Sequence, residues 1–337
     1  MNENKPFTAQ NNHLDSLVLL RGLAVIMVCF CHYGNPLSAG DHFFTKLFLF
    51  FKQYGKFGVE IFFVISGFII PYSLYKGKYQ LGDYFTFLYK RLLRLHPPYL
   101  LALFITLVIM YFSYKTRHVA FPEDFASITR SLVYLHFPPD NPVFWTLAVE
   151  AQYYLFVGLF YVLLVNYSLL AYFLVVPVFL FLGHTSLVEN FSLLKYFVFF
   201  FIGNAAFMIY LGIGNRWINS FSLASLVGFS YFFYELPAFL CSTFTLSFIL
   251  LYRKQVFSSL KFIGTISYSI YLIHFPIGIK FINLLKPRIN PSYSWLLFVV
   301  TVVFVVLVSF IFYKIIEAFS EDISKKIKYR EYKQRLL

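Results

Sequence analysis

Apolar stretches of about twenty residues follow one another along almost the whole chain, and they limit the possible folds more than any other feature of the sequence. A helix of that length can span a bilayer, because each helical residue adds about 1.5 Å and the backbone hydrogen bonds are satisfied within the segment. About ten such stretches can be separated, at residues 14–33, 57–75, 97–114, 143–165, 167–183, 192–212, 217–234, 236–252, 262–284 and 294–316. The sequence therefore predicts an all-α, polytopic membrane helix bundle of about ten transmembrane helices.

The composition agrees with a chain that lies in lipid. Hydrophobic residues make up 59% of the 337 positions and charged residues only 13%, whereas soluble domains are about half apolar and about a quarter charged. This excludes an ordinary soluble domain. The three cysteines, Cys29, Cys31 and Cys241, lie inside apolar runs without the spacing of metal ligands, so we expect neither a disulfide framework nor a metal site.

The formal net charge of +13 would suggest a nucleic-acid partner in a soluble protein, but in a membrane protein it usually reflects basic cytoplasmic loops. We expect the lipid bilayer as the surroundings and no nucleic-acid partner. With both termini in the cytoplasm, the loops on that side hold roughly twice as many Lys and Arg as the loops on the other side. Both termini are therefore predicted to be cytoplasmic. The predicted parts are an N-terminal segment at 1–13, a membrane domain at 14–316 and a basic tail at 317–337 along the inner membrane surface.

Ionisable side chains inside the apolar stretches are functional candidates, because each costs at least about 2.5 kcal/mol on insertion. Arg21 and His32 lie eleven residues apart in the first stretch. This spacing puts them on one helix face, about 16.5 Å apart along the axis. Arg21 is expected in the cytoplasmic half and His32 near the outer end. The alternative is that Arg21 extends to the headgroups and His32 lies at the interface.

Two carboxylates are expected inside the membrane on the side of His32. Glu60 enters at about the depth of His32 and could orient its imidazole as a base, or it could cap the N-terminus of its own helix. Glu150 is expected about 10 Å below the outer boundary, too deep for a cap, so it needs a partner inside the bundle. Ser66-Gly67 indicates close helix packing rather than a nucleophile.

Two further groups of polar residues lie at helical spacing. Arg91 and Arg94, just before the third apolar stretch, form one basic edge that suits paired phosphate contacts, although anchoring at the cytoplasmic surface would also explain them. Ser267, Tyr271 and His274 fall on adjacent turns of roughly one face of the ninth stretch. This stripe could be a functional surface or an ordinary helix contact.

Five of these segments, in this order, resemble the integral-membrane acyltransferase family called acyltransferase 3, which includes bacterial O-acetyltransferases of surface polysaccharides. The matching segments are the Arg21 and His32 pair, residues 58–68, Arg91 and Arg94 followed by Pro97, residues 145–154 and residues 267–274. One such motif alone would be a weak indication, whereas five in the same order on a compatible ten-span topology make the resemblance strong.

The resemblance implies an O-acyltransferase that moves an acyl group, most simply acetyl, from cytoplasmic acyl-coenzyme A to a hydroxyl of a carbohydrate, a glycolipid or a cell-surface glycan. It also implies a bacterial cytoplasmic membrane, acyl-coenzyme A as donor substrate and no bound cofactor. The implied site has donor-binding residues Arg21, Arg91 and Arg94, catalytic residues His32, Glu60 and Glu150, and acceptor-pocket residues Tyr153, Tyr154, Tyr271 and His274. Direct transfer with His32 as general base and a covalent acyl-His32 intermediate both fit the sequence.

A membrane transporter or flippase for a glycolipid or a small anion is the alternative, because it too would need buried charges near the midplane. Two features of the sequence count against it. No internal repeat is visible, and the ionisable residues are divided by leaflet, with basic residues near the cytoplasm and acids and histidines near the outer side.

Overall fold

The computed structural model describes residues 5–38, 43–252 and 256–330. These residues are almost entirely helical, and no β-strand occurs among them, which confirms the all-α class. The longer helices are α1 (Lys5–Leu37), α3 (Gly58–Lys76), α4 (Tyr84–Thr116), α6 (Trp145–Asn166), α9 (Leu193–Leu211), α10 (Arg216–Phe233), α11 (Leu236–Leu251) and α15 (Ser294–Phe312). The shorter ones are α2 (Thr45–Tyr54), α5 (Phe125–Leu132), α7 (Ser168–Leu170), α8 (Val176–Leu182), α12 (Ser258–Thr265), α13 (Ser267–Ile273), α14 (Lys280–Leu285) and α16 (Ala318–Lys326).

Seven helical segments of the described chain are long and apolar enough to cross a membrane. They span Asp15–Leu37, Thr45–Lys76, Leu81–Thr116, Pro142–Asn166, Leu193–Leu211, Ser267–Arg288 and Pro291–Lys326. Two shorter apolar segments, Ser168–Leu182 and Leu236–Leu251, match two further predicted stretches, and α10 lies on the remaining one. All predicted stretches thus lie on helices, while about ten crossings and cytoplasmic termini stay predictions.

The long apolar run from 143 to 252 is divided where the sequence offers stop and start signals. Helix α9 ends at Gly212, whose φ of 65° is left-handed and is tolerated by glycine. Asn215 then caps α10 by accepting a hydrogen bond from the N–H of Trp217 (2.8 Å). Pro237 lies in the first turn of α11, where a helix does not need its N–H.

Helices α3 and α9 pack backbone to backbone near the centre of the bundle. A Cβ atom added at Gly67 would collide with the backbone carbonyl of Phe200, and one added at Gly203 would collide with that of Val64. Glycines at such positions allow helices in a membrane to approach closely. This contact agrees with the packing role predicted for Ser66-Gly67.

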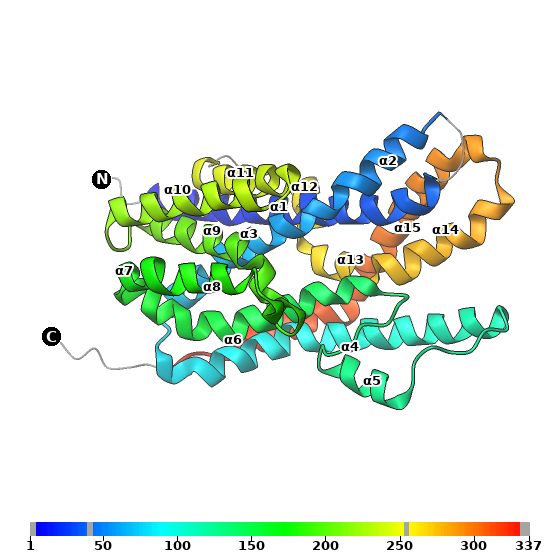
Figure 1. The fold of residues 1–337 in the computed structure, drawn as a ribbon. Helices are drawn as coiled ribbons and strands as arrows, with labels where there is room; N and C mark the ends of the chain where they lie inside the picture. Colours follow the sequence, from blue (N-terminus) through cyan, green and yellow to red (C-terminus); the bar gives the residue numbers. More distant parts are fainter. Residues whose placement is uncertain (1–4, 39–42, 253–255, 331–337) are drawn as a thin grey trace.

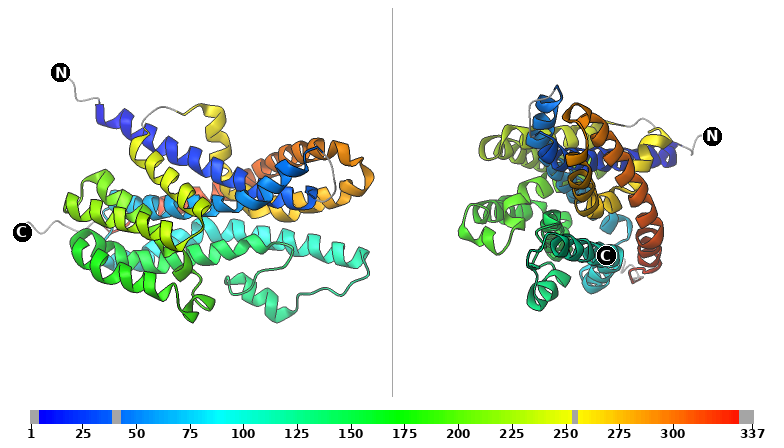
Figure 2. Two further views of the ribbon diagram at one scale, coloured as in Figure 1. Left: turned by 45° about the horizontal axis from the view of Figure 1, so that its top comes forward. Right: turned by 90° about the vertical axis from the view of Figure 1, so that its right-hand side faces the viewer.

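Helices α3, α9 and α13 lie between two groups of helices (Figure 1). Helices α1, α10 and α11 lie on one side of them, and α4 and α6 on the other. The rotated views of Figure 2 show the same division from two further directions. The central helices can therefore contribute side chains to spaces on both of their sides.

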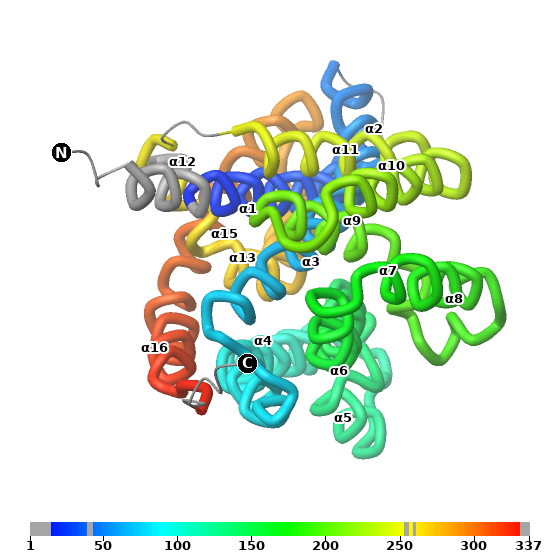
Figure 3. Tube along the Cα trace, turned by 90° about the vertical axis from the view of Figure 1, so that its left-hand side faces the viewer, coloured from blue at the N-terminus to red at the C-terminus, as the bar shows by residue number. Residues whose placement is uncertain are grey.

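The described chain ends close to the start of α4. Helix α16 packs along α4 (Figure 3), and the N–H of Arg330 donates a hydrogen bond to Asp83, directly before α4 (3.2 Å). Residues 331–337 of the predicted basic tail lie outside the described residues. The path of the tail along the membrane surface stays a prediction, as do the predicted domain limits.

Candidate active site

A cavity of about 690 Å³ lies among α1, α3, α4, α6 and α13. Arg21 from α1, Arg91 and Arg94 from α4 and Lys76 from α3 border it. The three arginines that were predicted to bind the donor therefore share one space, which we call the basic cavity.

Two of these guanidinium groups are available to an anion. Arg21 makes no hydrogen bond or ion pair in the part of the chain that the structure describes. The Arg91 guanidinium lies over the rings of Phe87 (5.5 Å to the ring centre) and Tyr154 (5.6 Å), which hold it without using its N–H groups. Because guanidinium forks bind phosphate oxygens in pairs, the basic cavity can hold a polyanionic group.

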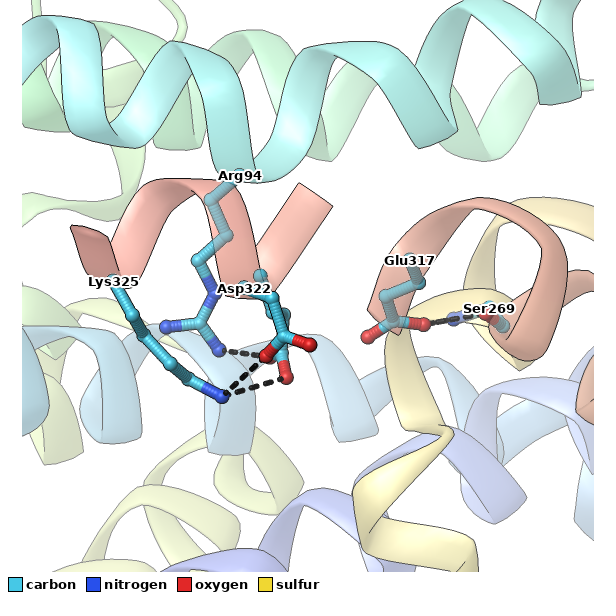
Figure 4. A network of polar contacts seen from close by, with 6 residues as sticks. Arg94, Ser269, Glu317, Asp322 and Lys325 are labelled. Atoms are coloured by element: carbon cyan, nitrogen blue, oxygen red, sulfur yellow. Dashed lines mark hydrogen bonds and ion pairs between the residues drawn. The ribbon is translucent and has the colours of Figure 1, made fainter. Parts of the chain in front are cut away.

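The third arginine is bound by the C-terminal helix. Arg94 donates a hydrogen bond to Glu321 of α16 (2.8 Å), and Lys325 lies 3.7 Å from the other carboxylate oxygen of Glu321 (Figure 4). Beside them, the buried Glu317 accepts hydrogen bonds from the backbone N–H (3.0 Å) and the hydroxyl of Ser269. Sequence reasoning missed this network, because its contacts join residues 227 and 48 positions apart.

Glu150 borders the basic cavity and does not border the cavity that contains His32, while its predicted depth on the outer side of the membrane stays a prediction. Its carboxylate accepts hydrogen bonds from Ser66 Oγ (3.3 Å) and from the hydroxyl of Tyr154. The expected partner inside the bundle is present, and no hydrogen bond joins Glu150 to His32 among the described residues. Helix rise gives the depth of a residue in the membrane but not its neighbours, so the sequence could not separate these two groups.

A second cavity, of about 730 Å³, contains His32 and Glu60, and we call it the His32 cavity. Glu60 Oε2 is buried without a hydrogen-bond partner among the described residues, and no hydrogen bond joins it to His32 there. Lys56 and Glu235 form an exposed ion pair (3.1 Å) that borders the same cavity, as does Lys195. A buried carboxylate oxygen without a donor is costly, so Glu60 can accept a hydrogen bond from a bound molecule.

His274 adjoins His32 and is fully buried, with the two ring centres 5.3 Å apart. Its Nδ1 lies within hydrogen-bond distance of the carbonyls of Ile270 (3.1 Å) and Tyr271 (2.8 Å), which assigns the proton to Nδ1 and leaves Nε2 as an acceptor. Nε2 has no partner among the described residues. His274 borders neither cavity, and its place in the acceptor pocket stays a prediction. It lies beside His32, through which it can act on a substrate.

The tyrosines predicted for the acceptor pocket are separated. Tyr153 is fully buried, donates a hydrogen bond to Oδ1 of Asn204 (2.9 Å), stacks on Phe200 and borders neither cavity. Tyr154 borders the basic cavity, and Tyr271 borders both cavities. Successive residues of a helix point about 100° apart, so Tyr153 and Tyr154 do not share one wall. Of the four predicted acceptor-pocket residues, only Tyr271 borders the His32 cavity.

An aromatic wall of the His32 cavity was missed by sequence reasoning. Trp145, Tyr196 and Tyr234 border this cavity, and the rings of Trp145 and Tyr196 lie 5.1 Å apart. Such rings can cover the apolar face of a sugar while their polar atoms reach its hydroxyls. Trp145 begins a segment that resembles the family, but in a chain that is 23% aromatic no single ring stands out, so the sequence holds no signal for Tyr196 and Tyr234.

Comparison with known proteins gives one match. The family model of acyltransferase 3, described as an acyltransferase domain, matches residues 14–314, and all residues that line the two cavities fall within this range. No curated protein and no solved structure matches the chain. Because the match covers nearly the whole chain and seven helical segments of the described residues are suited to cross a membrane, the chain belongs to the acyltransferase 3 family of membrane acyltransferases.

Proposed function

We propose that the protein is an integral-membrane O-acyltransferase of a bacterial cytoplasmic membrane. It moves an acyl group, most simply acetyl, from cytoplasmic acyl-coenzyme A to a hydroxyl of a carbohydrate, a glycolipid or a cell-surface glycan. The observation that supports this most is the division of charge between two adjoining cavities. Arg21, Arg91 and Arg94 border one of them, and His32 and Glu60 border the other. An anionic donor and a hydroxyl acceptor need these different surroundings.

The basic cavity is the proposed donor site, entered from the cytoplasmic side. Arg21 and Arg91 bind phosphate oxygens of coenzyme A, because both guanidinium groups have N–H donors to spare. The pantetheine arm passes apolar side chains such as Ile65 and Ile69. The distance of about 16.5 Å along α1 between Arg21 and His32 is one that an extended arm can cover.

His32 is the proposed general base. It takes the proton of the acceptor hydroxyl as the hydroxyl oxygen attacks the carbonyl carbon of the thioester. The C–S bond then breaks, and the proton passes to the leaving sulfur, so coenzyme A departs as the thiol. Glu60 and His274 orient the imidazole or the acceptor. Glu150 acts from the donor side, where it can contact the acyl carbonyl region rather than the imidazole.

A covalent route would use the same histidine as nucleophile. An imidazole nitrogen of His32 would take the acyl group, and the acceptor hydroxyl would then remove it. Single-turnover labelling without acceptor separates the routes, because acyl-protein accumulates only on the covalent one. The direct route is the simpler proposal, since it needs one transfer and no second activation of His32.

The acceptor is proposed to bind in the His32 cavity. Trp145, Tyr196 and Tyr234 would cover the apolar face of a sugar ring, and Glu60 would accept a hydrogen bond from one of its hydroxyls. A volume of about 730 Å³ accommodates a group of sugar size. A longer glycan would extend outward past the Lys56 and Glu235 ion pair.

The test is thiol release from acetyl-coenzyme A by the full-length protein in lipid vesicles, with an extract of surface polysaccharide as acceptor. We expect acceptor-dependent release from the wild type and a loss of about a hundredfold or more in His32→Ala. His118→Ala, on an exposed loop away from both cavities, is the control and should keep full turnover.

Two results would overturn parts of this proposal. Wild-type turnover by a folded His32→Ala variant would remove the histidine from the chemistry. A wild type that neither releases thiol nor binds labelled acetyl-coenzyme A would overturn acyl transfer from coenzyme A. Transport of a glycolipid or a small anion would then become the function to measure.

A further inference from the structure

Val59 and Tyr271 are the two described residues that border both cavities. Val59 lies on α3, directly before Glu60, and Tyr271 lies on α13, three residues before His274. The other lining residues of each cavity are absent from the lining of its neighbour. These two side chains therefore form the wall between the basic cavity and the His32 cavity.

Tyr271 is held in this wall from both sides. Its hydroxyl lies 2.6 Å from Oγ1 of Thr146, which borders the basic cavity, and 3.1 Å from the carbonyl oxygen of Val143, which borders the His32 cavity. The ring of Phe62 packs edge-on against it, and only 6% of Tyr271 is exposed. A side chain fixed by hydrogen bonds and packing does not swing aside freely, so Tyr271 is a rigid part of this wall.

The proposed reaction has to cross this wall. Arg21 and Arg91 border only the basic cavity, and His32 borders only the other one. A donor anchored at the arginines brings its thioester up to Val59 and Tyr271 from one side, while the acceptor hydroxyl approaches from the opposite side. The acyl group must therefore pass the wall to which these two side chains belong.

We propose that Val59 and Tyr271 form an acyl filter, which admits a short acyl group to the His32 cavity and keeps water of that cavity away from the thioester. This inference rests on the proposed function and adds to it the residues that set acyl length. Apolar Phe62, Phe63 and Leu147 also border the basic cavity, and apolar side chains beside a bound thioester disfavour the entry of water. Through an opened filter, water would attack the carbonyl carbon and break the C–S bond, which yields the free carboxylic acid and the coenzyme A thiol.

The experiment widens the filter with Val59→Ala in the full-length protein in lipid vesicles. Thiol release from acetyl-coenzyme A without acceptor should rise severalfold, because water reaches the thioester. The ratio of butyryl transfer to acetyl transfer should rise about tenfold or more, since one or two methylene groups in an apolar pocket discriminate by that much.

Two matched controls remove the same atoms elsewhere. Val25 of α1 and Val157 of α6 are buried and border neither cavity. Val25→Ala and Val157→Ala should keep the wild-type ratio of butyryl to acetyl transfer and the wild-type hydrolysis. A change of equal size in either control would mean that any loss of packing in the bundle has this effect, and the filter would be overturned.

Two further variants keep the inference testable if Val59→Ala does not fold. Val59→Ile narrows the same wall and should lower the butyryl to acetyl ratio below that of the wild type. Tyr271→Phe keeps the ring and loses the hydroxyl contacts, so hydrolysis should rise while the ratio stays within about twofold of the wild type. Opposite shifts of the ratio in Val59→Ala and Val59→Ile cannot come from general damage to the fold.

The outcomes separate the filter from the proposed function. If the wild type transfers acyl groups and both Val59 variants keep its ratio and its hydrolysis, the filter is overturned and the proposed function stands. If the wild type consumes neither acetyl- nor butyryl-coenzyme A, the proposed function itself is overturned, and the filter with it.

Discussion

His274 presents a single hydrogen-bond acceptor next to His32, because its Nδ1 is engaged by backbone carbonyls and its Nε2 has no partner in the described chain. Two hydrogen-bonded imidazoles have their ring centres roughly 5 Å apart, close to the 5.3 Å observed for this pair. A small rotation of His32 would let Nε2 of His274 accept its N–H. The other nitrogen of His32 would then be the base that faces the cavity.

This arrangement predicts different effects for two substitutions of His274 whose amide side chains differ only in length. His274→Asn should lower kcat by about tenfold or more and leave the KM for acyl-coenzyme A within about twofold, because the short amide cannot replace Nε2. His274→Gln, whose amide oxygen can take the position of Nε2, should retain more of kcat. Steady-state kinetics of both variants make the measurement. Equal losses of kcat, or a loss confined to KM, would speak against a positioning role.

At the scale of the helices, Arg94 both borders the basic cavity and binds α16. Arg94 binds Glu321 of α16, and Lys325, one turn later, offers the same carboxylate a second partner (Figure 4). A phosphate that enters the basic cavity therefore competes with Glu321 for Arg94. Helix α16 thus takes part in the electrostatics of the basic cavity from outside the range that the family model matches.

We predict that Glu321→Gln lowers the KM for acyl-coenzyme A about two- to fivefold, because Arg94 no longer has to leave a carboxylate and a partly exposed ion pair is weak. Asp322→Asn is the control, since Asp322 pairs with Lys325 (3.5 Å) and not with Arg94, and it should leave KM unchanged. Donor titrations of both variants are the measurement. A KM that rises in Glu321→Gln would mean that the carboxylate holds Arg94 in its binding position.

The contact between α3 and α9 predicts that alanine substitutions at two glycines change thermal stability differently. Gly67→Ala should lower the thermal stability of the purified protein in detergent, because the new Cβ meets the backbone of Phe200 and the two helices must separate. Gly228 on α10 has no neighbouring atom within 4 Å of an added Cβ, so Gly228→Ala should be neutral or slightly stabilising. Thermal unfolding of the two variants side by side is the measurement, and equal Tm values would show that the close approach does not limit stability.

At the scale of the whole molecule, the helices could be predicted well because a membrane helix is encoded locally. Apolar length marks each helix, and Gly212, Asn215 and Pro237 mark three of the boundaries. What the sequence does not encode locally is the rotation of each helix about its axis and the choice of its neighbours. The packing of α3 against α9 decides both, and it depends on contacts between distant residues.

The same distinction between locally encoded features and contacts of distant residues applies to the candidate site. Arg21, Arg91 and Arg94 were found because helical spacing and position near one surface are enough to group them. Glu150 and Tyr153 could not be assigned to a cavity from the sequence, since depth alone does not show that Glu150 borders the basic cavity and that Tyr153 binds Asn204. Their catalytic and binding roles stay predictions, and the two cavities now define which residues should be tested together.

The segments that line the two cavities also differ in how freely their sequences can change. Residues 183–196 and the turn at 233–235 contribute to the His32 cavity and not to the basic cavity, whereas α3 contributes to both. If the two cavities hold acceptor and donor as proposed, a mutation in either of the first two segments alters acceptor preference and leaves the proposed donor site unchanged, while a mutation on α3 affects both substrates. Divergence among related enzymes, and laboratory evolution toward new acceptors, should therefore accumulate in those two segments while α3 stays constrained.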